Sequence, residues 1–186
     1  TEGWERVFVK ADSPGYGKWK AAADVRAILF CRLINESPEY KQRFVRLVMD
    51  FLNHRVTETF MNSRVAYYEN LAVSYGLADL QFIQAYRDFA KNRPAFLREG
   101  MKKAFGIGPA YSCSVKGPPD MIFRVDGYVE RSGYAGEYFE QERMDVLPSE
   151  KDSERFSHWL VNGKRDESRH LALQIVSPTV VEAVYR

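Results

Sequence analysis

Carboxyl groups cluster near the middle of the second half of this 186-residue chain, where four acids fall close together: Glu137, Glu140, Glu142 and Asp145. Paired carboxylates can transfer protons or hold a cation. The order of residues alone does not show whether these side chains converge. One hypothesis is an enzyme site between the two halves of the chain, built from Asp126 and Asp145 with His158. Such a site requires a deep shared cleft.

The other groups that could do chemistry are isolated from one another. His54, His158 and His170 form no HExxH pair, so each is expected at the surface or hydrogen-bonded in the core. The turn at residues 15–18 has glycines and a lysine but does not match the phosphate-binding pattern GxxxxGK followed by Ser or Thr. The nucleophile elbow GxSxG and the kinase signals HRD and DFG do not occur. We therefore predict no catalytic, cofactor-binding or metal-binding residue in this chain.

The cysteines, the distribution of charge and the length of the apolar runs indicate which bonds and partners to expect. Cys31 and Cys113 have no CxxC spacing; one disulfide between them is open, but burial as small apolar side chains is favoured. The net charge is +2, with +5 on residues 1–107 and −3 on residues 108–186. Basic residues are interspersed with acids rather than gathered in a stripe, so no nucleic-acid partner is expected. The apolar runs are too short for a membrane span.

The spacing of apolar residues changes near residues 106–109, from helical before them to alternating after them. Hydrophobic residues make up 45% of the chain and aromatic residues 14%, which indicates a folded protein. We predict an α+β fold with a helical bundle-like segment at 1–107 and a small antiparallel β-sandwich-like module at 108–186. Because Thr1 opens the chain and no signal peptide follows, a processed or excised piece is expected.

Five short helices are predicted in the first half. The first runs from Asp24 to Ile34, and the second begins at Ser37-Pro38, because serine caps a helix and proline fits its first turn. The second helix is predicted to bury one apolar stripe, made of Tyr40, Phe44, Leu47, Val48, Phe51 and Leu52.

The remaining three helices are placed by their caps. Asn62 is predicted to begin the third, which ends at Gly76, and Asp79 to begin the fourth. Arg93-Pro94 is predicted to begin the fifth, which ends at Gly106. The third and fourth are expected to turn their apolar side chains into the core: Val65, Tyr68, Leu71, Ala72, Tyr75, Phe82, Ile83, Tyr86 and Phe89.

Short strands are predicted after residue 109. The dipeptide Asp126-Gly127 predicts a tight hairpin. Phe156 and Trp159 are the largest expected core side chains. The expected strands lie at 111–115, 121–125, 138–139, 144–147, 155–161, 170–176 and 180–185.

Two tyrosines are candidates for recognition. Tyr128 and Tyr134 are predicted on loops, where an exposed ring can contact a partner, although a partly packed surface tyrosine without such a role is favoured. These residues and the acidic β half motivate an alternative function, a free-standing surface adhesion or carbohydrate-binding module.

The order of segments resembles the C-terminal helical part of the CotH family of spore-coat-type atypical kinases. The likeness is carried by residues 33–44, with the sequence LINESPEYKQRF, then Asp50 to Asn53, Phe60, Arg64-Val65, and residues 89–105 around Arg93-Pro94. Residues 122–185 resemble the small β module that often follows in exported members, through Asp126-Gly127, residues 136–139, Val146, Phe156 and Trp159. The likeness covers about residues 24–186.

The resemblance implies a parent protein with a kinase-like fold that transfers phosphate from MgATP to protein hydroxyls, using aspartates upstream of the segment matched here. This chain has no counterpart of that aspartate motif, so no catalytic residue and no cofactor are assigned to it. We expect a non-catalytic C-terminal portion of an exported, cell-surface bacterial protein. Its expected partners are the upstream part of its own chain and a surface protein or glycan.

Overall fold

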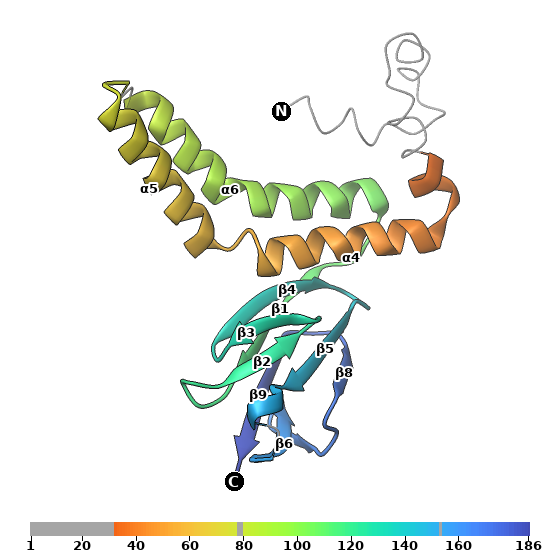
Figure 1. Cartoon of the computed structure of the whole chain (residues 1–186). Helices are drawn as coiled ribbons and strands as arrows, with labels where there is room; N and C mark the ends of the chain where they lie inside the picture. Colours follow the sequence, from red (N-terminus) through yellow and green to blue (C-terminus); the bar gives the residue numbers. More distant parts are fainter. Residues whose placement is uncertain (1–31, 78–79, 153) are drawn as a thin grey trace.

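The computed structural model describes residues 32–186 except 78, 79 and 153. The predicted turn at 15–18, the start of the first helix, Cys31 and the predicted Asp79 cap lie outside the described residues. Residues 32–36 are helical, and three longer helices follow: α4 (Pro38–His54), α5 (Glu58–Ser74) and α6 (Leu80–Phe105). Strands occupy the rest of the chain, so the fold is α+β as predicted (Figure 1). Within the described residues, no helix has the length and hydrophobicity needed to span a membrane.

The β module contains nine strands in the described part of the chain and a short 3₁₀ helix, η1 (Glu150–Asp152). In chain order the strands are β1 (Ala110–Lys116), β2 (Ile122–Val125), β3 (Tyr128–Arg131), β4 (Tyr134–Phe139), β5 (Arg143–Pro148), β6 (Phe156–Val161), β7 (Lys164–Asp166), β8 (Leu171–Gln174) and β9 (Thr179–Tyr185).

Helix α4 begins where the sequence predicts, but its buried face differs. The Ser37 side chain accepts a hydrogen bond from the Tyr40 amide at 3.2 Å, and Pro38 fits the first turn. Leu47 and Phe51 are 57% and 56% exposed, so their predicted burial is wrong. The apolar stripe is wider than the surface covered by the neighbouring elements, and the buried side chains are Val45, Met49, Leu52 and Asn53.

Helix α5 begins earlier than predicted and does not belong to a compact bundle. The Thr57 side chain accepts the Phe60 amide at 3.3 Å, so Thr57 caps the helix and Asn62 lies inside it. The correction has a local cause, because the Thr57 hydroxyl satisfies a free amide one turn before Asn62 can. Gly76 follows the helix with φ of +65°, as a helix-ending glycine does. No described α5 residue is buried, so the predicted core role of its aromatic side chains is wrong.

Helix α6 is one helix of 26 residues, not two, because it continues through Pro94. A proline inside a helix removes one hydrogen bond and bends the helix without having to end it, and Figure 1 shows α6 bent. The predicted inward positions of Tyr86 and Phe89 are wrong, since these side chains are 55% and 53% exposed. The helix ends at Gly106 with φ of +61°, as predicted.

The strands form two sheets with the core between them. One sheet has the order β4-β1-β9-β6-β7 and the other β3-β2-β5-β8. All pairs are antiparallel, as predicted for this module, except β1 with β9, which is parallel. The first and last strands of the module are far apart in the sequence and meet side by side. Trp159 is fully buried in the core, as predicted, and Phe156 packs against that core.

Tight turns place the two candidate tyrosines in strands. Asp126 and Gly127 have φ of +52° and +85° and join β2 directly to β3, which confirms the predicted hairpin. Tyr128 is therefore the first residue of β3 and Tyr134 the first residue of β4. Their predicted loop positions are wrong, because two-residue turns leave no loop for them to occupy.

A second core joins the helices to the β module. It contains Met49, Leu52, Met101 and Phe105 from α4 and α6, together with Phe139 from β4. Helix α4 lies between α6 and the β module (Figure 1). This packing positions the last two turns of α4 against β4 and the β2–β3 hairpin.

Candidate functional site

Asn53 joins the last turn of α4 to the free edge of β4. Its Nδ2 donates to the Glu137 carbonyl at 2.8 Å, and its Oδ1 accepts the Glu137 amide at 3.0 Å. Because β4 is an edge strand, Asn53 supplies the two hydrogen bonds that a further strand would otherwise make. The Asn53 residue is 5% exposed. Helix α4 is thereby held in a fixed register on the β module.

The next residue, His54, is enclosed by the β2–β3 hairpin and β4. Its side chain is 0% exposed. The ring stacks on Tyr128 and Tyr134, with centroids 4.3 and 5.2 Å away. His54 Nδ1 lies 2.8 Å from Glu130 Oε1, and Nε2 lies 3.8 Å from Asp126 Oδ2. The predicted hydrogen-bonded position of this histidine is confirmed.

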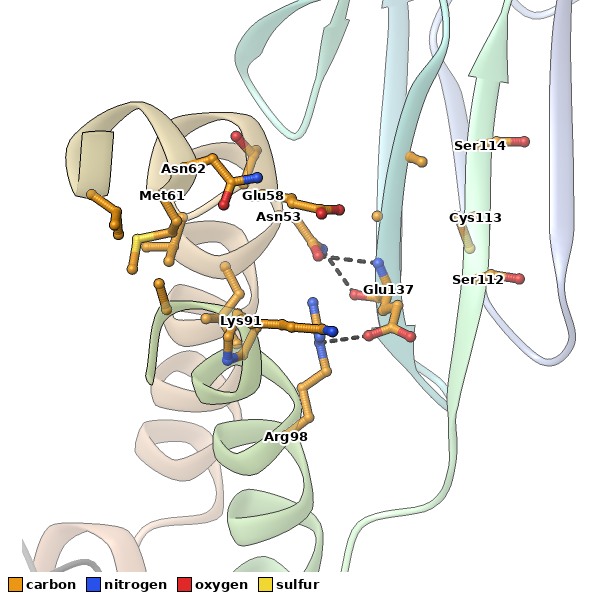
Figure 2. A pocket seen from close by; sticks show the side chains of 18 of the residues that line it. Asn53, Glu58, Met61, Asn62, Lys91, Arg98, Ser112, Cys113, Ser114 and Glu137 are labelled. Atoms are coloured by element: carbon orange, nitrogen blue, oxygen red, sulfur yellow. Dashed lines mark hydrogen bonds and ion pairs between the residues drawn. The ribbon is translucent and has the colours of Figure 1, made fainter. Parts of the chain in front are cut away.

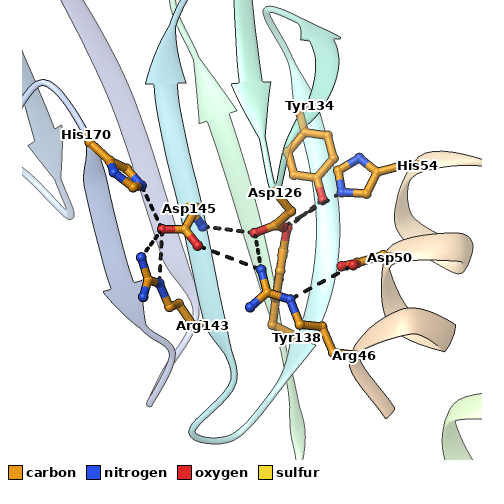
Figure 3. Close-up of polar contacts among 9 residues, drawn as sticks. All are labelled: Arg46, Asp50, His54, Asp126, Tyr134, Tyr138, Arg143, Asp145 and His170. Atoms are coloured by element: carbon orange, nitrogen blue, oxygen red, sulfur yellow. Dashed lines mark hydrogen bonds and ion pairs between the residues drawn. The ribbon is translucent and has the colours of Figure 1, made fainter. Parts of the chain in front are cut away.

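Asp126 is fixed at the hairpin turn by contacts on both carboxyl oxygens. Its Oδ1 accepts the Asp145 amide at 2.9 Å, and its Oδ2 accepts the Tyr138 hydroxyl at 2.5 Å. The Tyr138 and Tyr134 hydroxyls are 2.8 Å apart. The Asp126 side chain is 1% exposed. Figure 3 shows this carboxyl group between His54 and Asp145.

Arg46 connects the carboxyl groups of the two halves (Figure 3). Its guanidinium lies 4.0 Å from Asp50 Oδ2 on α4, and 3.7 Å from both Asp126 Oδ1 and Asp145 Oδ2. Asp145 is also paired with Arg143 at 2.7 Å and with His170 at 2.8 Å. We call Arg46, Asp50, His54, Asp126, Glu130 and Asp145 the junction cluster.

The electrostatics of the junction cluster reflect its burial. Burial lowers the pKa of His54, but hydrogen bonding and attraction to Asp126 and Glu130 outweigh it and raise the pKa overall. Burial, followed by repulsion from Asp126, raises the pKa of Asp50. Burial also raises the pKa of the neighbouring Glu142 to about 7. These carboxyl groups therefore lie close together at partly buried positions, where little water screens their charges.

The structure brings together only part of the predicted acidic set. Asp126 and Asp145 meet as the shared-site hypothesis requires, but the histidines beside them are His54 and His170. His158 lies on β6 in the other sheet, next to Ser157. Glu137 instead pairs with Arg98 of α6 at 2.7 Å.

Sequence reasoning missed three members of the cluster on one helix: Arg46, Asp50 and His54. Their spacing of four residues, which places them on one face of α4, is the signal that could have found them. Asp50, His54 and Asp126 each present one ligand atom, and these atoms lie within 4.8 Å of one another. Within the described residues, this trio has the donor types and proximity to hold a metal ion.

A groove of about 990 Å³ separates the α5–α6 hairpin from β1 and β4. Figure 2 shows Lys91 and Arg98 on its helical wall and Ser112, Ser114 and Glu137 on the strand side. Cys113 also borders the groove, but burial raises its thiol pKa to about 11, so the thiol is protonated at neutral pH. This is not the environment of a reactive cysteine.

The outer surface of the α5–α6 hairpin is rich in large apolar side chains. On α5 these are Phe60, Tyr67, Tyr68 and Leu71, followed by the C-cap residue Tyr75, with exposed fractions from 40% to 71%. On α6 they are Tyr86, Phe89 and Phe96, with exposed fractions from 42% to 55%. We call these eight residues the hairpin apolar face.

Comparisons of this chain with protein-family models, with curated proteins and with solved structures found no match. The resemblance to the CotH family stays a prediction.

Proposed function

We propose that this chain is the non-catalytic C-terminal portion of an exported CotH-like protein. In this proposal, α4–α6 complete a helical lobe with the preceding part of the same protein, and the β module is an interaction module attached to that lobe. The observation that carries the proposal is helix α5, which has 17 residues and none of them buried.

The hairpin apolar face has the pattern of a packing surface. Phe60, Tyr67, Leu71 and Tyr75 recur at intervals of seven, four and four residues, which places them on one stripe of α5. An exposed apolar stripe on a helix is typical of a surface that packs against another element or partner. Burying a large apolar side chain contributes about 1.5–3 kcal/mol, so covering even this stripe would contribute several kcal/mol.

The attachment of the β module also supports the proposal. Asn53 and the junction cluster fix α4 on the β module, while the shared core holds α6 on α4. The hairpin apolar face therefore has a defined position relative to the β module. A segment that covers the face would hold the module in one orientation on the lobe.

The carbohydrate-binding alternative is less well supported by the geometry. Sugar rings stack on exposed aromatic faces, whereas Tyr134 is 6% exposed and both candidate tyrosines stack on His54. Their positions suit the attachment of α4 to the β module better than recognition of a glycan.

The proposal is tested by placing one substitution in two contexts, this 186-residue chain and the longer protein that the proposal requires. Leu71→Gln keeps a good helix former on α5 while removing an apolar side chain from the face. Because Leu71 is 40% exposed in this chain, we expect the loss of unfolding free energy in the longer protein to exceed the loss in the short chain by about 0.6–1.2 kcal/mol.

A matched control uses an exposed apolar residue on the β module. Val129 is 66% exposed on β3, so Val129→Thr should have little effect in either context. If the cost of Leu71→Gln is the same in the two contexts, as the cost of Val129→Thr should be, the preceding part of the chain does not cover the hairpin apolar face.

A further inference from the structure

The junction cluster contains a buried imidazole nitrogen without a hydrogen-bond partner. His54 Nε2 is inaccessible to solvent, and its distance of 3.8 Å from Asp126 Oδ2 is too long for a hydrogen bond. Buried polar atoms are almost always paired, so an unpaired one needs a physical explanation. Carboxyl groups of Asp50, Asp126 and Glu130 lie around this ring, so a positively charged species is the partner that their charges favour.

The other ring nitrogen already has the partner that a metal-bound histidine uses. His54 Nδ1 lies 2.8 Å from Glu130 Oε1, and a ligating histidine commonly donates its second N–H to a carboxylate. With the proton on Nδ1, the Nε2 lone pair points toward Asp126. Glu130 would then fix both the tautomer and the orientation of the ring.

Two carboxyl groups stand beside this lone pair. Asp50 lies one helical turn before His54 on α4, and Asp126 lies on the β2–β3 turn, oriented by the Asp145 amide and the Tyr138 hydroxyl. The three ligand atoms are within 4.8 Å of one another. Two ligands at about 2.1 Å from a common ion are separated by about 3.4 Å at a tetrahedral angle, so a small adjustment of the side chains would close the site.

We propose that Asp50, His54 and Asp126 bind one divalent transition-metal ion, and that Zn²⁺ matches the donor set best. One imidazole nitrogen with two carboxylate oxygens suits Zn²⁺ better than Mg²⁺, which prefers oxygen ligands alone. Arg46 supplies the nearest other cation to these carboxyl groups, and its distances of 3.7 and 4.0 Å exceed hydrogen-bonding range. The ion would connect α4 to the β2–β3 hairpin, and the site does not depend on the proposed function of the hairpin apolar face.

The test is a Zn²⁺ titration of the whole 186-residue chain after treatment with a chelator, using calorimetry or a chromogenic competitor. We expect saturable binding of one ion per chain, with much weaker binding of Mg²⁺. Asp50→Asn should weaken Zn²⁺ affinity at least tenfold. Because Asp50 makes only a 4.0 Å ion pair with Arg46, this variant is expected to fold, and circular dichroism checks that it does.

Two further variants separate the site from ordinary surface binding. Glu130→Gln should weaken affinity about 10–100-fold, as expected for the partner of a ligating histidine. His170→Asn is the matched control, because His170 is an exposed histidine paired with Asp145 and should leave affinity unchanged. In nuclear magnetic resonance spectra, Zn²⁺ should shift the His54 ring signals and not those of His158 or His170.

Three results would overturn the metal site. The first is the absence of saturable Zn²⁺ binding, which would mean that a proton on His54 Nε2 balances the negative charge of the carboxyl groups. The second is a folded Asp50→Asn variant with unchanged affinity, and the third is a loss of binding in His170→Asn. Either of these would place the bound ion elsewhere.

Discussion

The attachment of α4 to the β module predicts that Asn53→Ala is strongly destabilising. The substitution removes both hydrogen bonds to the Glu137 backbone, at 2.8 and 3.0 Å. The amide and carbonyl of Glu137, on the partly covered edge of β4, then have no side-chain partner. Each hydrogen bond contributes about 0.5–1.5 kcal/mol net, and each backbone group left unpaired costs up to about 1–3 kcal/mol when fully buried. Because these groups are only partly buried, we expect a total loss of about 2–4 kcal/mol.

The assay is urea unfolding followed by circular dichroism, with Asn62→Ala as the control. Asn62 is exposed on α5, so its replacement removes the same amide group and gains the same helix propensity without touching β4. At about 2–4 °C per kcal/mol for a chain of this size, Asn53→Ala should lower the melting temperature by roughly 4–16 °C. If the two variants unfold within about 0.5 kcal/mol of each other, Asn53 does not hold α4 on β4.

Two further predictions concern the polar groups of the β module beside α4. Burial raises the pKa of Glu142 from its ordinary 4.5 to about 7, so the folded protein holds this proton more tightly than the unfolded chain does. The stabilising contribution of the protonated Glu142 side chain is therefore complete below about pH 4.5 and is lost as the pH rises through 7. The variant Glu142→Gln should match the native protein at pH 4 and exceed its stability by about 2–3 kcal/mol at pH 8. The measurement is urea unfolding in the presence of a chelator. Tyr138→Phe removes the hydroxyl that donates to Asp126 at 2.5 Å and should cost about 1–3 kcal/mol in thermal unfolding, and an unchanged melting temperature would contradict that contact.

Local chemistry explains which elements the sequence predicts correctly. The Ser37-Pro38 start, the Asp126-Gly127 hairpin and the Gly106 stop each depend on a few adjacent residues, and all three occur in the structure. The predicted start at Asn62 is wrong because Thr57 competes for the same role one turn earlier. The predicted break at Pro94 is wrong because a helix packed on a neighbour can bend through a proline.

Burial and the junction cluster were harder to predict, for two different reasons. The stripe on α5 has the spacing of a core face, yet burial depends on a neighbouring surface, and none of the described elements covers it. His54 and Asp126 lie 72 positions apart in the chain, so their contact follows from packing rather than from a motif. The four-residue spacing of Arg46, Asp50 and His54 was the only local signal.

The most direct test of the proposed function is amide hydrogen exchange along α5, residues 58–74, in this chain and in the longer protein. We expect the α5 amides to exchange at least tenfold more slowly in the longer protein, because the preceding part of the chain would cover the hairpin apolar face. The amides of β1 and β9 should exchange equally in both proteins. Equal exchange along α5 in the two proteins would contradict the claim that these helices complete a larger lobe.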